Sequence, residues 1–317
     1  SVSYVIREAA TPLPAFLVAA TGTVTLAAKA LPVVADCDVL VAGGGTGGAP
    51  AAISAGRHGM KTILCEALDV LGGLETEGRI GNYWFGNICG FTREIDAGVS
   101  ATGRVFSQAK AEWYRRACRK AGVEILFGTT VEGVVLEDHR LVAVVVVLPD
   151  GTRGAIRCRA AIDSTGNAVL PALAGEPTDY ISAEELALQG AGVAPRLLGA
   201  SYSNSDLGFV DTTDAGDLFG FLLRARRSVP ETNWDSSKLA GTRERRRMVG
   251  AFFMSPLDVM NVRTYPDTVV QTFSNFDSHG QTLAPAFFIT TPPHTGMGVN
   301  LPYRCLLPQK TDGLLVT

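Results

Sequence analysis

The strongest structural signal in this sequence is CDVLVAGGGTGGAPAAISAGRHGMKTILCE, from Cys37 to Glu66. It begins with an apolar run, Val39 to Ala42, that is typical of a strand buried on both faces. After a glycine-rich turn, small and apolar residues recur at helical spacing, which predicts a helix that ends near Gly59. The chain becomes extended again at residues 62–65 and ends with an acid. The stretch therefore predicts a strand, a turn, a helix and a second strand.

The turn is expected to cradle phosphates with Gly43, Gly45, Thr46, Gly47 and Gly48. Gly43 permits a tight turn, Gly45 lets the backbone approach a pyrophosphate, and Gly48 lets the helix pack closely on the strand. The phosphates would bind the free N–H groups at the positive end of the helix. Glu66 is placed to accept hydrogen bonds from the adenosine ribose hydroxyls. Because strand, helix and acid agree, we interpret the stretch as a dinucleotide-binding unit rather than as a purely structural turn.

The composition of the chain limits its class. A chain of 317 residues that is 46% hydrophobic and 19% charged can bury a large core and form two domains. Its net charge of -3 gives no electrostatic reason to expect nucleic acid or an anionic membrane as a partner. No apolar run is long enough to span a bilayer. The six cysteines are scattered, without a C-x-x-C pair, so we expect no metal site and interpret most of them as buried thiols.

Residues 1–36 precede the first predicted strand and form an N-terminal extension. Within it, Phe16 to Ala28 is rich in Thr, Val and Ala around a central Thr-Gly, which predicts a pair of short strands. The interruptions of this run and the nearby Lys29 argue against the core of a signal peptide.

A long glycine-rich loop is expected from Leu68 to Asp96, where the sequence has no helical or strand period. Its aromatic residues are Tyr83, Trp84, Phe85 and Phe91. Loops of this length in a compact domain are usually functional or disordered, and the aromatic residues argue against disorder. We interpret Gly72 and Gly73 as a continuation of the cofactor cradle, and the aromatic part as a wall for the reactive ring. The alternative is an ordinary ordered surface loop.

These segments resemble the FAD-dependent oxidoreductases of the glutathione-reductase-like superfamily, most of all the branch that shares the Gly-Gly doublet and an aromatic loop after the ribose acid. The resemblance implies FAD as the cofactor. It also implies an α/β fold: a Rossmann-like FAD-binding domain with an inserted β-meander, and a mixed α+β substrate domain. The FAD domain would comprise residues 37–180 and 297–317, and the substrate domain residues 181–296.

The sequence after the loop supports this resemblance. A helix is expected from Gly103 to Ala121, with Gly122 as its stop and Phe106, Ala109, Trp113 and Ala117 on one face. Strands are expected at 123–127, 131–136 and 141–148, with turns at 137–140 and 149–151. The small strands resemble the superfamily's meander, in which the backbone at Val131 would meet the adenine.

The segment from Ala160 to Asn167 resembles the superfamily's second flavin motif, a strand that ends in Ala-Thr-Gly-Asp. Thr165 and Gly166 match this motif, whereas Ser164 and Asn167 replace the usual Ala and Asp. Asparagine keeps the hydrogen-bonding shape but loses the charge, so the match supports the fold more than a role for Asn167. A chance combination of strand and turn is the alternative, and its place after the meander disfavours it.

The glycine-rich pattern stops between Tyr180 and Pro293. Asp214 is expected to cap a helix with an apolar face of Leu218, Phe221, Leu222 and Ala225. The basic run Arg243 to Arg247 is interpreted as the solvated face of another helix rather than as a nucleic-acid site. Strands are expected at 269–273 and 285–290.

The substrate is expected near residues 255–282. Oxidation of a CH–OH or CH–NH group by a flavin requires a base, and histidine titrates in the useful range. We therefore predict His279, with Asp277 beside it, as the base, and Arg263 or Tyr265 as groups that orient the substrate. The alternatives are a His279 that only ties down a turn, and His294 as the base. One His–Asp pair is poor support for a metal site.

The final stretch, Leu306 to Thr317, resembles the superfamily's last flavin strand. In relatives this strand continues into a turn and a helix that close the flavin site. We therefore expect a second polypeptide, either a cleaved C-terminal half or a separate subunit, to complete the site. Cys89 is the one side chain of the long loop that resembles a covalent flavin attachment point, and we interpret it as a free buried thiol.

The predicted function is the two-electron oxidation or reduction of a small organic substrate by FAD. Two alternatives stay open. An NAD(P)-dependent dehydrogenase is disfavoured by the 164–166 motif and by the long aromatic loop. A subunit whose nucleotide is structural, or relays electrons, would have its chemistry elsewhere in a complex.

Overall fold

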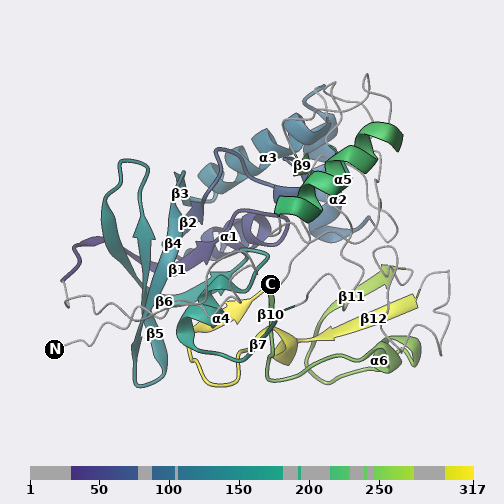
Figure 1. Cartoon of the computed structure of the whole chain (residues 1–317). Helices are drawn as coiled ribbons and strands as arrows, with labels where there is room; N and C mark the ends of the chain where they lie inside the picture. Colours follow the sequence, from purple (N-terminus) through teal and green to yellow (C-terminus); the bar gives the residue numbers. More distant parts are fainter. Residues whose placement is uncertain are drawn as a thin grey trace.

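The computed structural model describes residues 30–77, 88–103, 106–180, 192–193, 215–228, 239–240, 246–274 and 297–317. Figure 1 shows a central sheet with helices against it and smaller strand pairs beyond it. The predicted strand pair at 16–28, the helix cap Asp214 and the strand at 285–290 lie outside the described residues.

The main sheet has seven strands. They are β1 (Val33–Ala42), β2 (Thr62–Glu66), β3 (Glu124–Phe127), β4 (Thr130–Glu137), β5 (Arg140–Val147), β6 (Arg153–Asp163) and β13 (Leu314–Val316). Their order is β3-β2-β1-β6-β5-β4, and β13 pairs with β6. The β1, β2, β3, β6 and β13 pairings are parallel, whereas β4 and β5 add an antiparallel hairpin. This arrangement confirms the predicted α/β fold with an attached meander.

Strand β6 joins the meander to the parallel part of the sheet. Its first half, Arg153 to Arg157, pairs with β5, and its last residues, Ala161 to Asp163, pair with β13. Strand β1 runs along most of the same strand, from Val33 opposite Ala155 to the end. This long partner explains why β1 begins six residues before the predicted Val39. Half of the added residues are exposed, and Asp36 and Asp38 interrupt their apolar pattern.

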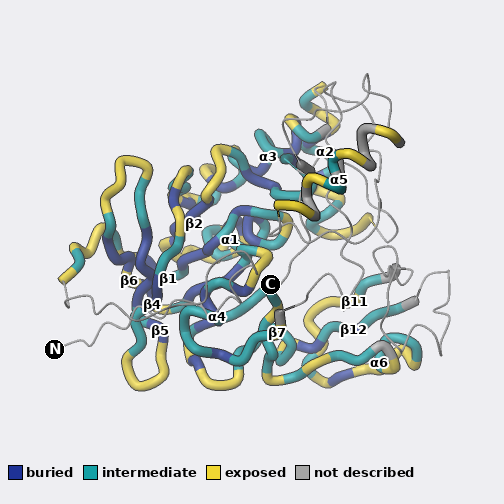
Figure 2. Tube along the Cα trace, viewed as in Figure 1, coloured by how far each residue is buried: buried dark blue, intermediate teal, exposed yellow. Residues whose placement is uncertain are grey.

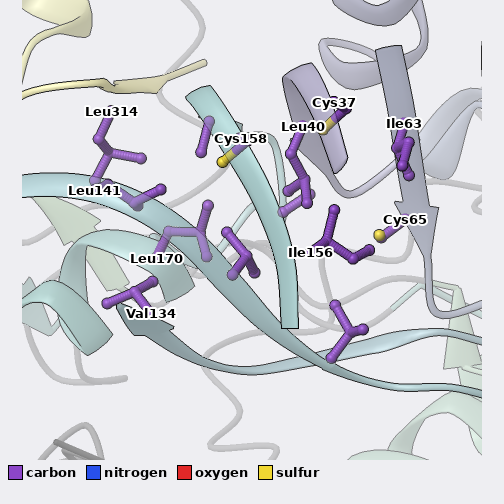
Figure 3. Close-up of a cluster of buried hydrophobic side chains, with 14 residues drawn as sticks. Cys37, Leu40, Ile63, Cys65, Val134, Leu141, Ile156, Cys158, Leu170 and Leu314 are labelled. Carbon is purple, nitrogen blue, oxygen red and sulfur yellow. The ribbon is translucent and has the colours of Figure 1, made fainter. Parts of the chain in front are cut away.

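Two hydrophobic clusters cover the two faces of the sheet. One face packs on α1 (Gly48–Arg57), α2 (Gly90–Ser100) and α3 (Phe106–Lys120). The other face packs on the meander and on α4 (Val169–Ala174), and Figure 3 shows residues of this cluster. Figure 2 shows that burial is concentrated in the central strands of the sheet and in α1, whereas the tip of the β4–β5 hairpin is exposed.

The helix α2 corrects the predicted loop, which was expected to continue to Asp96. Phe91 lies in this helix and packs edge to face on Trp113 of α3, with 5.8 Å between ring centroids. The guanidinium of Arg57 in α1 lies 5.3 Å from the Phe91 ring centroid. Phe91 therefore joins three helices, and its role as part of a wall for the reactive ring stays a prediction. Tyr83, Trp84 and Phe85 lie outside the described residues.

The helix α3 confirms the predicted helix, but its most buried face is shifted by one residue. Lys110, Tyr114 and Cys118 are each at most 1% exposed, whereas Trp113 and Ala117 are only half-buried. Gly122 has a φ of +74° and ends the helix as predicted. The predicted hairpin turn is also confirmed, because Asp138 and His139 both have positive φ, as a two-residue turn requires.

The described parts between residues 178 and 302 form smaller units. They are β7 (Thr178–Tyr180) with β10 (Arg246–Met248), β8 (Gly192–Val193) with β9 (Leu239–Ala240), β11 (Thr268–Ser274) with β12 (Met297–Pro302), α5 (Ala215–Ser228) and α6 (Pro256–Met260). Short 3-10 helices are η1 (Gly73–Glu75) and η3 (Tyr303–Leu306). The strand β10 corrects the basic run: Arg246 and Arg247 lie in a strand, not on a helix, because they pair with β7.

The strand β13 confirms the predicted final strand, and Gly313 before it has a φ of +74°. The second polypeptide and the domain boundaries at 36, 180 and 297 stay predictions. Among the described residues, no helix combines the length and the apolar character needed to cross a membrane.

Candidate cofactor site

The carboxyl ends of β1, β2, β6 and β13 meet at one edge of the sheet, where α/β proteins bind ligands. The N–H of Gly43 donates to the carbonyl of Cys65 at 2.8 Å, and the N–H of Ser164 donates to the carbonyl of Ala42 at 2.8 Å. The hydroxyls of Ser164 and Thr317 hydrogen-bond to each other beside Gly47. The turn after β1 and the second motif, predicted separately, are therefore one structural unit.

Two glycines of this turn have structural roles that the structure confirms. Gly43 has a φ of +91°, and a Cβ there would lie 2.4 Å from the carbonyl oxygen of Ser164. A Cβ on Gly48 would lie 1.8 Å from the carbonyl oxygen of Gly43, so only glycine allows α1 to start this close to β1. Gly45 differs, because a Cβ there would meet nothing closer than the Gly73 Cα at 4.0 Å. The fold leaves open space above Gly45.

Four consecutive backbone N–H groups, those of Gly45, Thr46, Gly47 and Gly48, donate to no group in the part of the chain that the structure describes. The helix α1 that follows has no side-chain cap at its start. Such N–H groups at a helix N-terminus carry positive partial charge and need acceptors. The turn therefore has the donors that a pyrophosphate requires.

Glu66, which ends β2, is 9% exposed and reaches back to the same turn. Its Oε2 accepts a hydrogen bond from the Gly44 N–H at 2.6 Å, and its Oε1 accepts from the Leu68 N–H at 2.8 Å. Each carboxylate oxygen has a second lone pair, so both can also accept from a hydroxyl. Glu66 thus fixes the turn and keeps acceptor capacity that suits ribose hydroxyls.

The Gly72–Gly73 doublet lies directly on this turn, as expected. The Gly72 N–H donates to the Gly44 carbonyl at 2.8 Å, and a Cβ on Gly73 would lie 3.0 Å from the Gly45 Cα. Both glycines have positive φ, which favours glycine. The doublet extends the cradle by backbone-to-backbone packing.

The second motif contains a buried acid that the sequence analysis missed. Asp163 is 1% exposed and accepts hydrogen bonds from the Thr165 N–H at 2.8 Å, the Thr165 hydroxyl at 2.7 Å and the Leu170 N–H at 2.7 Å. Burial raises the pKa of Asp163, and these hydrogen bonds oppose the rise. The available signal was an acid at the end of an apolar strand, directly before the Thr-Gly turn.

The remaining predicted cofactor residues lie around this unit. Gly166 has a φ of +74° and forms the turn after β6, and the Asn167 side chain accepts from the Arg246 N–H at 3.3 Å. Val131 lies at the start of β4, two residues after Thr129, whose N–H donates to the Glu66 carbonyl at 3.0 Å. The start of the meander is thereby held beside the ribose acid. The contacts of these residues with a cofactor stay predictions.

Arg263 and Tyr265, two of the predicted catalytic residues, lie together between α6 and β11. The Arg263 guanidinium pairs with Asp258 at 2.8 Å and lies 5.4 Å from the Tyr265 ring centroid. Tyr265 is 7% exposed and packs against Phe252 and Arg304. Its hydroxyl has no hydrogen-bond partner among the described residues, and desolvation raises its pKa. His279, Asp277 and His294 lie outside the described residues.

The described thiols agree with the prediction except at Cys89. Burial raises the pKa of Cys65, Cys118 and Cys158 to about 12 and that of Cys37 to about 11. Cys89 precedes α2 and is exposed, so its interpretation as a buried thiol is wrong. Among the described residues, no cluster of His, Cys, Asp and Glu side chains could hold a metal ion.

Several solved structures are similar to parts of this chain. A geranylgeranyl bacteriochlorophyll reductase-like protein from Thermoplasma acidophilum is 16% identical, with a TM-score of 0.42 over 68% of this chain and 66% of that one. THI4 from Thermovibrio ammonificans is 19% identical, with a TM-score of 0.37 over 55% of this chain and 79% of that one. The myxobacterial chondrochloren halogenase CndH is 17% identical, with a TM-score of 0.36 over 53% of this chain and 47% of its own.

The FAD dependent oxidoreductase family matches residues 38–189 and 223–317, which together are more than half of the chain. The match includes the turn after β1, the doublet, the second motif and β13. It favours FAD over the NAD(P)-dependent alternative. The chain therefore belongs to the FAD dependent oxidoreductase family.

Proposed function

We propose that this enzyme carries out the two-electron oxidation or reduction of a small organic substrate, such as a compound with a CH–OH or CH–NH group. The observation that carries the proposal is the row of N–H groups from Gly45 to Gly48, without acceptors in the described structure and next to the buried Glu66. This arrangement suits an adenine dinucleotide. When bound, FAD supplies a hydride acceptor or donor.

Different residues of the cradle would bind different parts of the cofactor. The N–H groups at the start of α1 would bind the pyrophosphate, Glu66 the adenosine ribose, and the backbone near Val131 the adenine. The Gly72–Gly73 doublet and the turn at Thr165 and Gly166 would line the flavin half. This division is supported by the way the doublet and the second motif both contact the turn after β1.

The substrate side would be formed by the segments between residues 178 and 302. Figure 1 shows β11 and β12 on the side toward which β13 points. Of the two predicted orienting groups, Arg263 is the better candidate, because its side chain is 58% exposed whereas Tyr265 is 7% exposed. Its pairing with Asp258 leaves further N–H donors for an anionic or hydroxylated substrate. His279, with Asp277, would take or return the substrate proton.

The test is an anaerobic screen of the purified flavoprotein. Alcohols, sugars, hydroxy acids, amino acids and amines are added one at a time, and the visible flavin absorbance is followed. Loss of the absorbance with alcohols or amines supports the proposal. The reverse reaction is tested by adding the corresponding carbonyl compounds and imines to the reduced flavoprotein. If no alcohol or amine reduces the flavin, and no carbonyl compound or imine reoxidises it, the proposal fails and a relay role is favoured.

The catalytic base is tested with two histidine variants. We expect His279→Gln to slow flavin reduction by the active substrate while leaving the flavin content unchanged. The control is His58→Gln, because His58 is exposed at the C-cap of α1 and, among the described residues, its ring bonds to the Ser54 carbonyl alone. Equal rates for the wild type and His279→Gln would remove His279 from the mechanism.

A further inference from the structure

A buried charged cluster lies behind the cofactor cradle and was not foreseen from the sequence. The Lys110 ammonium lies 2.6 Å from the Glu75 Oε1 atom, and the Tyr114 hydroxyl lies 3.3 Å from the Glu75 Oε2 atom. The side chain of Lys110 is 1% exposed and that of Glu75 is 19% exposed. Lys110 and Tyr114 come from consecutive turns of α3, whereas Glu75 belongs to η1.

The cluster is connected to the cradle by a short chain of contacts. Glu75 lies in η1, which starts with Gly73, and Gly73 packs on Gly45. Thr76 closes this turn, because its hydroxyl donates to the Leu71 carbonyl at 2.8 Å and its methyl group covers Gly72. The position of Glu75 therefore sets the position of the doublet relative to the turn after β1.

Burial of an ion pair costs free energy of folding, because both ions lose hydration. An apolar residue at position 110 would serve packing equally well, since the neighbours of Lys110 on α3 already contribute to the core. The Lys110 ammonium neutralises the Glu75 carboxylate. Glu75 is two residues from the doublet, and an unneutralised carboxylate there would repel an anionic ligand.

We propose that Glu75, Lys110 and Tyr114 form a positioning clamp for the cofactor: Tyr114 and Lys110 hold η1 against α3, and Lys110 neutralises Glu75 beside the pyrophosphate site. The clamp rests on the proposed cradle, since it acts by placing Gly72 and Gly73 on the Gly44–Gly45 backbone. None of its three residues touches the cofactor in this scheme. Its effect is on FAD affinity.

The experiment is a double-mutant cycle on FAD binding to the flavin-free protein. The variants are Lys110→Met, Glu75→Gln, and the two together, and flavin fluorescence gives the Kd for FAD. We expect Lys110→Met to weaken FAD binding by roughly tenfold or more, because it leaves the largely buried Glu75 carboxylate without its cation. We expect the double variant to recover most of this loss, because both charges are then absent.

A second measurement separates positioning from general stability. The thermal unfolding of each flavin-free variant is recorded, and the Kd is measured well below its midpoint. The control is Glu112→Gln, which removes an ion-pair partner of Arg115 and Arg116 from the same helix. It is expected to leave the Kd for FAD unchanged. Tyr114→Phe is expected to raise the Kd by a smaller factor than Lys110→Met, since it removes one hydrogen bond and no charge.

The outcomes distinguish the clamp from the cradle. If Gly45→Val weakens FAD binding and Lys110→Met does not, the clamp is wrong and the cradle stands. If neither change affects the Kd, the cradle itself is wrong. If the double variant binds FAD as poorly as Lys110→Met although its flavin-free form unfolds at the wild-type temperature, charge neutralisation is refuted.

Discussion

The carboxylate of Glu66 lies 2.6 Å from the backbone nitrogen of Gly44, so the acid that ends one strand holds the turn that follows its neighbour. The same carboxylate accepts from the Leu68 N–H, which orders the start of the next loop. One side chain therefore fixes two segments of the cradle. Its removal affects both the shape of the site and its contact with a ribose.

Substitution of Glu66 by glutamine is expected to weaken FAD binding by roughly tenfold to a hundredfold, because the amide group turns one acceptor into a donor that faces a backbone N–H. Titration of the flavin-free protein with FAD measures this change. Asp69→Asn, an exposed acid three residues later, is the matched control. Equal affinities for Glu66→Gln and the wild type would argue against the ribose contact.

The two glycines Gly45 and Gly48 are expected to respond differently to alanine. Gly48→Ala places a methyl group 1.8 Å from a carbonyl oxygen, so we expect a loss of about 2–4 kcal/mol in the free energy of unfolding of the flavin-free protein. Gly45→Ala has room in the fold, so its unfolding should change by less than about 1 kcal/mol while its FAD affinity falls. Denaturant unfolding and FAD titration of both variants check this pair. A stable Gly48→Ala protein would contradict the close start of α1.

Asp163→Asn is expected to destabilise the protein by about 1–3 kcal/mol, because three donors lose an ionised acceptor. The cost should also depend on pH. Since burial raises the pKa of Asp163 above 3.8, the folded state binds its proton more tightly than the unfolded state does. This contribution to stability is fully present below the unfolded pKa and is lost as pH rises through the folded pKa.

The stability difference between the wild type and Asp163→Asn should therefore grow as pH falls from neutral toward 3.8. Urea unfolding of both proteins at a series of pH values measures it. Other acids, such as Glu112 with a pKa lowered to about 2, change the free energy of unfolding of both proteins equally. Their effects therefore cancel in the difference. A difference that shrinks on acidification would show that Asp163 is ionised more easily in the folded protein.

The six thiols are expected to fall into three classes of reactivity. Cys89 is exposed and should react fast with a thiol reagent at neutral pH, and the half-buried Cys305 should react more slowly. Cys37, Cys65, Cys118 and Cys158 should react only after unfolding, because burial raises their pKa values and blocks access. Mass spectrometry after timed alkylation identifies each site. Fast labelling of Cys118 would contradict the packing of α3.

The nucleotide-binding unit was predictable because its signals are local. The apolar strand, the glycine turn, the helical spacing and Glu66 all lie within one stretch of sequence. Features that depend on distant partners were not predictable in the same way. The first half of β1 exists because β6 lies beside it, and β10 exists because β7 does.

One error had a signal that was overlooked. Phe91, Ile95 and Val99 recur at a spacing of four, which is helical, yet the glycine-rich sequence before them favoured a loop. The burial of Lys110 gave no such signal, because a lysine is expected on the solvated face of a helix and its partner Glu75 is distant in the sequence. The roles predicted for His279 and Asp277 stay predictions, because both residues lie outside the described residues.

The pairing of Leu314 with Ala161 has a consequence for how the enzyme is made. On the ribosome, β6 emerges long before its last neighbour, and all the residues between them must be synthesised first. Until then the last residues of β6, Ala161 to Asp163, have no strand on the side away from β1, next to the nascent cofactor turn. Premature termination or slow translation in this interval would leave an aggregation-prone edge, which chaperones would have to shield.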